Sequence, residues 1–228
     1  MKIAIVHDWL TGMRGGEKCL EVLCTLYPSA DLFTLLHIPG SVSSTIESHS
    51  IHTSFIQNLP FVESKYRYYL PLMPLAIERF NFQKYDLIIS SSHCVAKSVK
   101  PRSGSLHICY CHTPMRYIWD QFDQYFCITK SGLIPWVIMK LLRPWFQRWD
   151  SKTSSRVDHY IANSRHVQKR IKKYYQREAT VIHPPVDTKR FKPSGHREND
   201  YFLIVSAFAP YKRVDLAVEA FNKLGYPF

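Results

Sequence analysis

The chain has 228 residues, of which 46% are hydrophobic and 21% are charged, and its formal net charge is +12. This composition is ordinary for a globular protein and excludes wholesale disorder. No apolar run reaches the roughly 18 residues of a membrane-spanning helix, and the first residues are typical of a strand rather than a signal peptide.

Short apolar runs alternate with helical patterns along most of the chain. Helices are predicted at Glu17–Tyr27, Tyr66–Phe80, Ile134–Arg156 and Arg165–Tyr175. The apolar runs predict buried strands at Ile3–His7, Asp31–His37, Asp86–Ser91, Leu106–Cys111, His159–Ala162 and Thr180–His183. Such alternation predicts an α/β fold, a Rossmann-like doubly wound parallel sheet with helices on both faces.

Polar residues follow several of the predicted strands directly. Ligands bind beyond the carboxyl ends of parallel strands, so these residues are candidates for the site. They are Asp8, Gly12, Gly15 and Gly16 after the first strand, His93 and His112 after two central strands, and the helix N-cap pair Asn163 and Ser164 after the next. The glycine spacing is not G-x-G-x-x-G and no G-K-[ST] follows, so it predicts neither a dinucleotide nor a nucleoside triphosphate at this turn.

The end of the sequence has the composition of a linker and then of a new domain. Residues 1–185 are predicted to form the N-terminal domain and residues 186–200, with Pro193 and Gly195, a linker. Residues 201–228 contain one apolar run and one amphipathic helix pattern. A single strand and helix cannot form a domain, so we expect a second domain that is truncated here.

The cysteines and the basic residues have separate implications. The six cysteines form no C-x-x-C pair, which favours reduced thiols in a cytoplasmic protein. Cys109 and Cys111 share one face of a strand while His112 points to the other, so no metal site is predicted there. Between residues 130 and 177, twelve Lys or Arg oppose Asp150 and Asp158, a balance of +10. This positive excess favours binding to nucleic acid, to an anionic membrane or to a phosphorylated substrate. The alternative is a helix face whose cations are simply solvated.

The stretch GLIPWVIMKLLRPWFQRW at 132–149 interleaves tryptophans with cations, and Pro144 is expected to kink its helix. Two interpretations stay open. The helix rests on anionic lipid and brings the protein to a lipid-linked acceptor, or it is a core helix whose cations reach the surface.

Four stretches, in this order, resemble the family 4 glycosyltransferases of the GT-B fold, the group 1 retaining enzymes. They are MRGGEK in the glycine turn, YCHTPMRYIWD at 110–120, DHYIANSRHVQKRI followed by VIHPPVDTKRF, and VSAFAPYKRVDLAVEAFNKLG. The resemblance implies two Rossmann-like domains around a cleft, the first binding the acceptor and the second the nucleotide-diphospho sugar. It implies retaining transfer of a hexose, with mannose as one candidate, to a saccharide or lipid-linked acceptor in bacterial surface polysaccharide synthesis. No metal or other cofactor is expected.

The resemblance also assigns roles to individual residues. His112 matches the histidine near the transferred sugar, where it hydrogen-bonds a hydroxyl or takes up a proton. Gly15 and Gly16 match the turn beside the donor diphosphate, and Lys212 matches the lysine that holds the donor phosphates. Asp8, Arg116 and Asn163 complete the predicted substrate-binding set. Ala207 stands where many relatives carry an arginine, which weakens the expected phosphate clamp.

The family's pair of glutamates eight positions apart does not occur in this sequence, so we expect these 228 residues alone to be inactive. Two alternatives remain. The segment at 130–177 is the surface of a nucleic-acid-binding module, although no helix-turn-helix, zinc finger or RNP motif accompanies it. In the second alternative the chain is a noncatalytic scaffold of glycosyltransferase fold. This alternative stays open because Ala207 replaces the arginine that many relatives carry.

Overall fold

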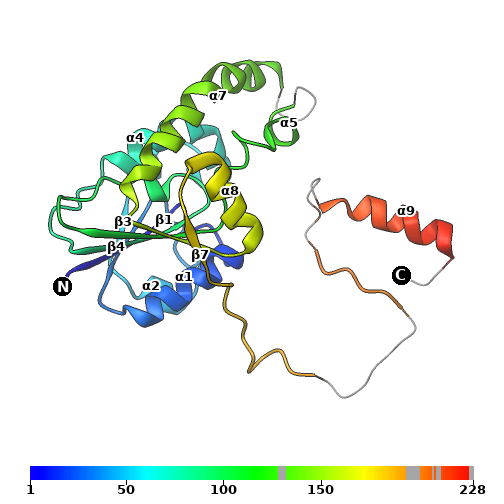
Figure 1. Ribbon diagram of the computed structural model, residues 1–228, viewed down its shortest axis with the longest axis horizontal. Helices are drawn as coiled ribbons and strands as arrows, with labels where there is room; N and C mark the ends of the chain where they lie inside the picture. The colour runs from blue at the N-terminus through cyan, green and yellow to red at the C-terminus, as the bar shows by residue number, and fades with distance from the viewer. Residues whose placement is uncertain (128–131, 194–200, 207, 209–211, 226–228) are drawn as a thin grey trace.

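The computed structural model describes residues 1–127, 132–193, 201–206, 208 and 212–225. Its centre is a seven-stranded parallel sheet with the strand order β3-β2-β1-β4-β5-β6-β7 (Figure 1). The chain order reverses between β1 and β4, as in doubly wound Rossmann-like folds, and this confirms the predicted fold class. The strands are β1 (Ile3–His7), β2 (Asp31–Thr34), β3 (Ile51–Thr53), β4 (Leu87–Ser92), β5 (Leu106–Cys111), β6 (His159–Ala162) and β7 (Ala179–Val181).

Helices cover both faces of the sheet (Figure 1). α1 (Gly15–Leu26) and α2 (Ser44–Glu47) pack on the face that carries Ile5, whereas Ala4 and Val6 face the opposite core. This division follows from the alternation of side chains along a strand. The second face is covered by α4 (Met73–Glu78), α7 (Leu133–Thr153) and α8 (Arg165–Tyr175). The remaining short helices of this region are η1 (Phe55–Asn58), α3 (Val62–Lys65), η2 (Tyr66–Leu72), η3 (Ala96–Ser98), α5 (Phe122–Tyr125) and η4 (Ser154–Arg156).

The structure divides the helix that was predicted as Tyr66–Phe80. Its first part is the 3-10 helix η2 and its second part is α4, with Pro71 inside the former and Pro74 in the first turn of the latter. A proline has no N–H to donate and its ring opposes the preceding turn, so one continuous α-helix is disfavoured. The three-residue strand β3 was not predicted, because Ile51–Thr53 is too short to show a period.

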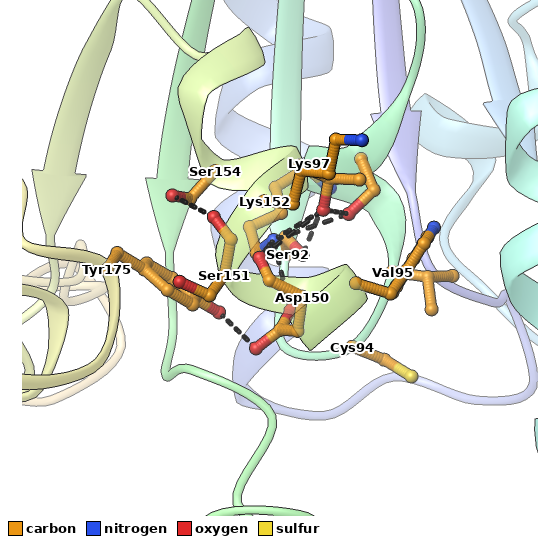
Figure 2. Close-up of polar contacts among 12 residues, drawn as sticks. Ser92, Cys94, Val95, Lys97, Asp150, Ser151, Lys152, Ser154 and Tyr175 are labelled. Carbon is orange, nitrogen blue, oxygen red and sulfur yellow. Dashed lines mark hydrogen bonds and ion pairs between the residues drawn. The ribbon is translucent and has the colours of Figure 1, made fainter. Parts of the chain in front are cut away.

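A buried ion pair joins α7 to η3, in the loop after β4 (Figure 2). Lys97 and Asp150 are almost completely buried, and Lys97 Nζ lies 3.0 Å from Asp150 Oδ1. The other carboxylate oxygen accepts hydrogen bonds from Trp119 Nε1 at 2.8 Å and from the Tyr175 hydroxyl at 3.0 Å. Neutralisation and hydrogen bonding together make a buried charge tolerable. This network therefore joins the loop after β4, α7 and α8.

α7 continues through Pro144 as one helix and buries Met139, Phe146, Asp150 and Thr153. Among the helices of the described residues, none combines the length and the hydropathy needed to cross a bilayer.

The last described residues lie apart from the sheet (Figure 1). Residues 201–206 were predicted as the first strand of a second domain, but they are exposed and form no strand. A strand is stabilised by hydrogen bonds to a neighbouring strand, and the described residues provide none there. The predicted helix is present as α9 (Val214–Leu224), with no buried residue. The proposed domain boundaries stay a prediction.

Candidate active site

Three histidines meet where β1, β4 and β5 end, at the point where the strand order reverses. His7 is the last residue of β1, His93 follows β4, and His112 follows β5. The ring centroids of His7 and His93 are 6.1 Å apart, and those of His93 and His112 are 6.4 Å apart. Doubly wound sheets bind ligands at this topological switch point. The cluster of His7, His93 and His112, hereafter the histidine cluster, is therefore the candidate active site.

Ser91 joins two members of the histidine cluster. Its hydroxyl oxygen lies 3.1 Å from His7 Nδ1 and 2.9 Å from His112 Nε2. The register of the sheet explains this contact, because His7 pairs with Ser91 across β1 and β4, and paired residues of parallel strands share a face. The sequence showed three serines at the end of β4 but gave no sign that this one bridges two imidazoles.

The N-terminus of α1 closes the cluster from one side. A Cβ placed on Gly16 would lie 3.7 Å from atoms of both the His7 and His112 rings, an ordinary van der Waals contact, so the first turn of α1 lies directly against both rings. Gly15 begins the helix, is exposed and has open space beside it. The backbone N–H groups of a first helical turn have no partner within the helix. Both glycines thus lie where a bound anion would be favoured.

Glu17 is a buried carboxylate beside the histidine cluster. Its Oε1 is 3.8 Å from His7 Nε2, and its Oε2 accepts a hydrogen bond of 3.1 Å from the Arg14 N–H. Burial alone would raise the pKa of Glu17. The contact with His7, helped by a backbone hydrogen bond and by His93, outweighs burial, so the pKa of Glu17 is lowered. Glu17 is therefore ionised at neutral pH. In the sequence, Glu17 was only the first residue of the helix predicted at Glu17–Tyr27.

His112 is half-buried and held from several sides. Its backbone carbonyl accepts a hydrogen bond of 3.1 Å from Asn163 Nδ2, and its ring packs edge-on against Tyr110. Burial, and then the neighbouring His7 and His93, lower the pKa of His112 to about 3. The imidazole is consequently neutral at neutral pH. Of the two roles left open by the sequence, hydrogen bonding to a hydroxyl suits this site better than uptake of a proton.

Asp8 requires a correction, because its placement leaves no oxygen for a substrate. Its side chain is 0% exposed, and Oδ2 accepts hydrogen bonds from the N–H groups of His93 and Cys94 at 2.7 and 2.9 Å. Oδ1 accepts from the N–H groups of Val95 and Ala96 at 2.6 and 2.8 Å. Asp8 therefore holds the loop after β4 and, through it, His93, whose Nδ1 lies 3.1 Å from Oδ2.

Asn163 also supports the site through the backbone. While Nδ2 bonds to the His112 carbonyl, Oδ1 accepts a hydrogen bond of 3.1 Å from the Ser164 hydroxyl. Ser164 caps α8 by accepting from the Val167 N–H at 3.2 Å, which confirms the predicted N-cap. Arg116 is half-buried near His93, where its charge contributes to a lowered pKa of His93 that is due first to burial. Gly16 and Asn163 lie beside His112 and Arg116 lies near His93, while their roles in substrate binding stay predictions.

The two residues discussed for the phosphate clamp, Lys212 and Ala207, lie after the last strand of the sheet. Lys212 lies just before α9, and α9 lies apart from the sheet (Figure 1). Ala207 lies outside the described residues, as does Lys130 at the start of the basic segment. The phosphate clamp that involves Lys212 stays a prediction.

Several cations of the basic segment at 130–177 are bonded to other groups of the same chain. Arg143 donates to the carbonyls of Ile118 and Trp119, and Arg156 pairs with Glu78. Arg170 pairs with Asp120, Lys172 with Glu178, and Arg177 donates to three backbone carbonyls at 154–158. These bonds reduce the positive surface available to a polyanion, so the segment is a weaker nucleic-acid surface than its sequence suggests.

No three His, Cys, Asp or Glu side chains are grouped for metal binding within the described part of the chain. Cys109 and Cys111 pack in the core beneath α8, on the opposite face of the sheet from His112. This orientation agrees with the alternation expected along β5.

Comparison with known proteins gives two findings. Residues 34–190 match the family model Glycosyltransferase Family 4. Among solved structures, the chain is similar to the crystal structure of Anabaena Alr3699/HepE in complex with UDP, with 14% sequence identity and a TM-score of 0.45. That match covers 82% of this chain and 45% of the Anabaena chain, and a likeness at this level carries no argument about activity. No curated protein matches the sequence.

Proposed function

The chain belongs to Glycosyltransferase Family 4, and from this premise we propose that it supplies the acceptor-side domain of a retaining glycosyltransferase. The donor is a nucleotide-diphospho sugar, and the group transferred is a hexose, with mannose as the first candidate. One observation carries the proposal: a neutral, half-buried imidazole, His112, lies beside the N-terminus of α1 at the switch point of the sheet.

The chemistry of this transfer fits the residues at the site. The bond from the anomeric carbon to the diphosphate breaks, so the negative charge on the leaving diphosphate increases. Donors that are already oriented stabilise such a charge without reorganisation. The N–H groups of Gly15 and Gly16, in the first turn of α1, have no partner inside the helix and are such donors. Lys212 is the proposed cation from the second domain.

The neutral His112 orients a hydroxyl of the sugar or of the acceptor by hydrogen bonding. Arg116, close to His93, offers a further positive charge toward a phosphate or a hydroxyl. Asp8 and Asn163 act indirectly, since both are engaged with the backbone that carries His93 and His112.

A donor screen tests the proposal. Purified chain, and the full product of its gene, are incubated with GDP- and UDP-sugars and an acceptor panel, and the released nucleoside diphosphate is measured. His112→Ala is expected to lower turnover about tenfold or more, since at least one hydrogen bond to the bound hydroxyl is lost. His159→Ala is the matched control, because His159 is exposed at the opposite end of its strand. Equal turnover by both variants would remove His112 from the mechanism.

A membrane surface is the proposed location of the acceptor. One side of α7 packs on the sheet, whereas its other side leaves large apolar residues exposed, with Leu141 at 76% and Ile134 at 72%. This α7 surface consists of Leu133, Ile134, Val137, Ile138, Leu141 and Trp145. Exposed cations at Lys140, Arg148 and Lys152 accompany it. An apolar strip with cations beside it suits the headgroup region of an anionic bilayer, from which a lipid-linked acceptor is presented.

Liposome co-sedimentation tests this location. The chain is expected to bind vesicles containing anionic phosphatidylglycerol and to be released by salt, since about 1 kcal/mol of attraction comes from each cation near the surface. Leu141→Ser should weaken binding, whereas Leu26→Ser should not, because Leu26 is also an exposed leucine but lies on α1, outside the α7 surface. No binding at any salt concentration would eliminate the membrane proposal.

A further inference from the structure

The Ser91 hydroxyl has one proton, yet two imidazole nitrogens lie within hydrogen-bond distance of its oxygen. When both rings are neutral, one nitrogen must accept the Ser91 proton and the other must donate to the Ser91 oxygen. The direction of the first bond therefore decides the direction of the second. This coupling makes the protonation pattern of His112 depend on that of His7.

Glu17 determines which nitrogen of His7 carries the proton. Its Oε1 faces His7 Nε2 across 3.8 Å, which is longer than a hydrogen bond but close enough for the charge to act in a buried site. His7 Nε2 is buried and has no other partner within the described residues. A lone pair on this nitrogen would be repelled by the ionised carboxylate, whereas an N–H is attracted to it. Neutral His7 thus carries its proton on Nε2 and accepts the Ser91 proton at Nδ1.

The Ser91 oxygen is then left as an acceptor for His112 Nε2–H. His112 Nδ1 makes no hydrogen bond in the described part of the chain. This nitrogen is also not one of the fully buried, partnerless atoms, so it is accessible to solvent or to a ligand. The other titratable groups nearby contact different partners. His93 Nδ1 lies beside Asp8 Oδ2, and Glu17 Oε2 accepts a hydrogen bond from the Arg14 N–H. None of these groups competes with Ser91 for His112 Nε2.

We propose that Glu17, His7 and Ser91 are positioning residues that hold His112 as its Nε2–H tautomer and present Nδ1 as an acceptor for a sugar hydroxyl. Hydrogen bonds run from His112 to Ser91 and from Ser91 to His7, and the Nε2–H of His7 faces the Glu17 carboxylate across 3.8 Å without a hydrogen bond. This inference rests on the proposed function for its ligand, but the tautomer itself is a property of the protein alone. An imidazole fixed in this way selects a hydroxyl proton and rejects a bare acceptor atom.

The neighbouring serine on β4 offers a matched control. Ser90 and Ser91 are both completely buried, and Ser90 Oγ lies 2.8 Å from His107 Nε2 on the opposite face of the sheet. His107 Nδ1 lies 2.9 Å from the Arg156 carbonyl, to which it can only donate, so His107 is the Nδ1–H tautomer. His107 and His112 should therefore show opposite tautomers in one spectrum.

The test is NMR of the chain with ¹⁵N-labelled histidine at pH 8.5, about two units above the ordinary pKa of an imidazole. We expect His112 to be protonated at Nε2 and His107 at Nδ1. Ser91→Ala should leave His112 averaging between two tautomers, Ser91→Thr should restore the single form, and Ser90→Ala should leave His112 unchanged. A wild-type His112 protonated at Nδ1 would overturn the proposal, as would an unchanged His112 in Ser91→Ala. The wild-type spectrum decides the first point even if a variant fails to fold.

Kinetics separate this inference from the proposed function. With a donor identified by the screen, Ser91→Ala should lower kcat about tenfold, the equivalent of one hydrogen bond, and change the KM for the donor much less. A screen without any active donor would defeat the proposed function while the predicted tautomers could still be observed. If the predicted tautomers are observed but kcat is unchanged in Ser91→Ala, the hydrogen bonds through Ser91 have no part in the reaction.

Discussion

Replacing Asp8 by asparagine changes one atom of a carboxylate that accepts four backbone hydrogen bonds. Asparagine keeps one carbonyl oxygen, which can still accept two of the N–H groups from the loop after β4. The amide NH₂ then faces the other two N–H donors, to which it cannot bond. Because the site is completely buried, water cannot replace the lost acceptor.

The expected loss follows from these contacts. Two hydrogen bonds to a charged acceptor disappear, each worth about 1.5–3 kcal/mol, so the free energy of unfolding should fall by about 3–6 kcal/mol. A native domain has about 5–15 kcal/mol in total, so Asp8→Asn should be folded marginally or not at all at 37 °C.

Urea unfolding followed by tryptophan fluorescence measures this loss. The matched control is Asp158→Asn, since Asp158 is exposed and accepts a single backbone hydrogen bond of 2.8 Å, from the His107 N–H. Its cost should stay below about 1 kcal/mol, because an exposed amide oxygen still accepts that bond. An Asp8→Asn protein as stable as the control, with donor binding weakened instead, would refute the structural role and restore Asp8 as a substrate-binding residue.

Three further predictions concern the core and the site. Lys97→Met should lower the free energy of unfolding by about 3–5 kcal/mol, because Asp150 stays buried without its cation, and the double variant Lys97→Met/Asp150→Leu should be more stable than the single one in thermal melts. Burial lowers the pKa of His107 to about 4, so the unfolded chain binds a proton there more readily, and about 3 kcal/mol of stability present above pH 6.5 should be lost as the pH falls to about 4. The acid dependence measured for His107→Gln should lack this component, and an identical dependence would contradict the assignment. Gly16→Ala should fold and bind donor normally, since its Cβ makes ordinary contacts at 3.7 Å, whereas Gly16→Val should displace His112 and lower turnover; equal turnover by the two variants would contradict this placement.

The periodicity of the sequence predicted the sheet well where the local pattern was long enough. The strands at 3–7, 106–111 and 159–162 and the helix at 165–175 have the predicted bounds, because buried runs and helical spacing are local properties. Prolines divided the helix predicted at 66–80, and the apolar run after residue 200 has no neighbouring strand to pair with in the described residues. Local patterns do not report such pairing.

The candidate site was predicted in position but less well in detail. The rule for the carboxyl ends of parallel strands located His112, Gly16 and Asn163 correctly near one another. It placed Asp8 among the substrate contacts, since a charged residue after a strand looks the same whether it faces a ligand or a loop. The roles of Ser91 and Glu17 were missed because they depend on which side chains face them: Ser91 belongs to none of the four stretches, and Glu17 stands in MRGGEK without an assigned role.

By itself, the sequence determined the fold class, the family and the edge of the sheet where the candidate site lies, since each depends on the order and spacing of residues along the chain. The tertiary structure alone decided which side chains face one another there. His7 and Ser91 are separated by 84 residues in the chain, yet the register of β1 and β4 places them 3.1 Å apart. Hydrogen-bond partners and burial are set by such long-range pairing, and they determine whether a polar residue supports the protein or contacts its ligand.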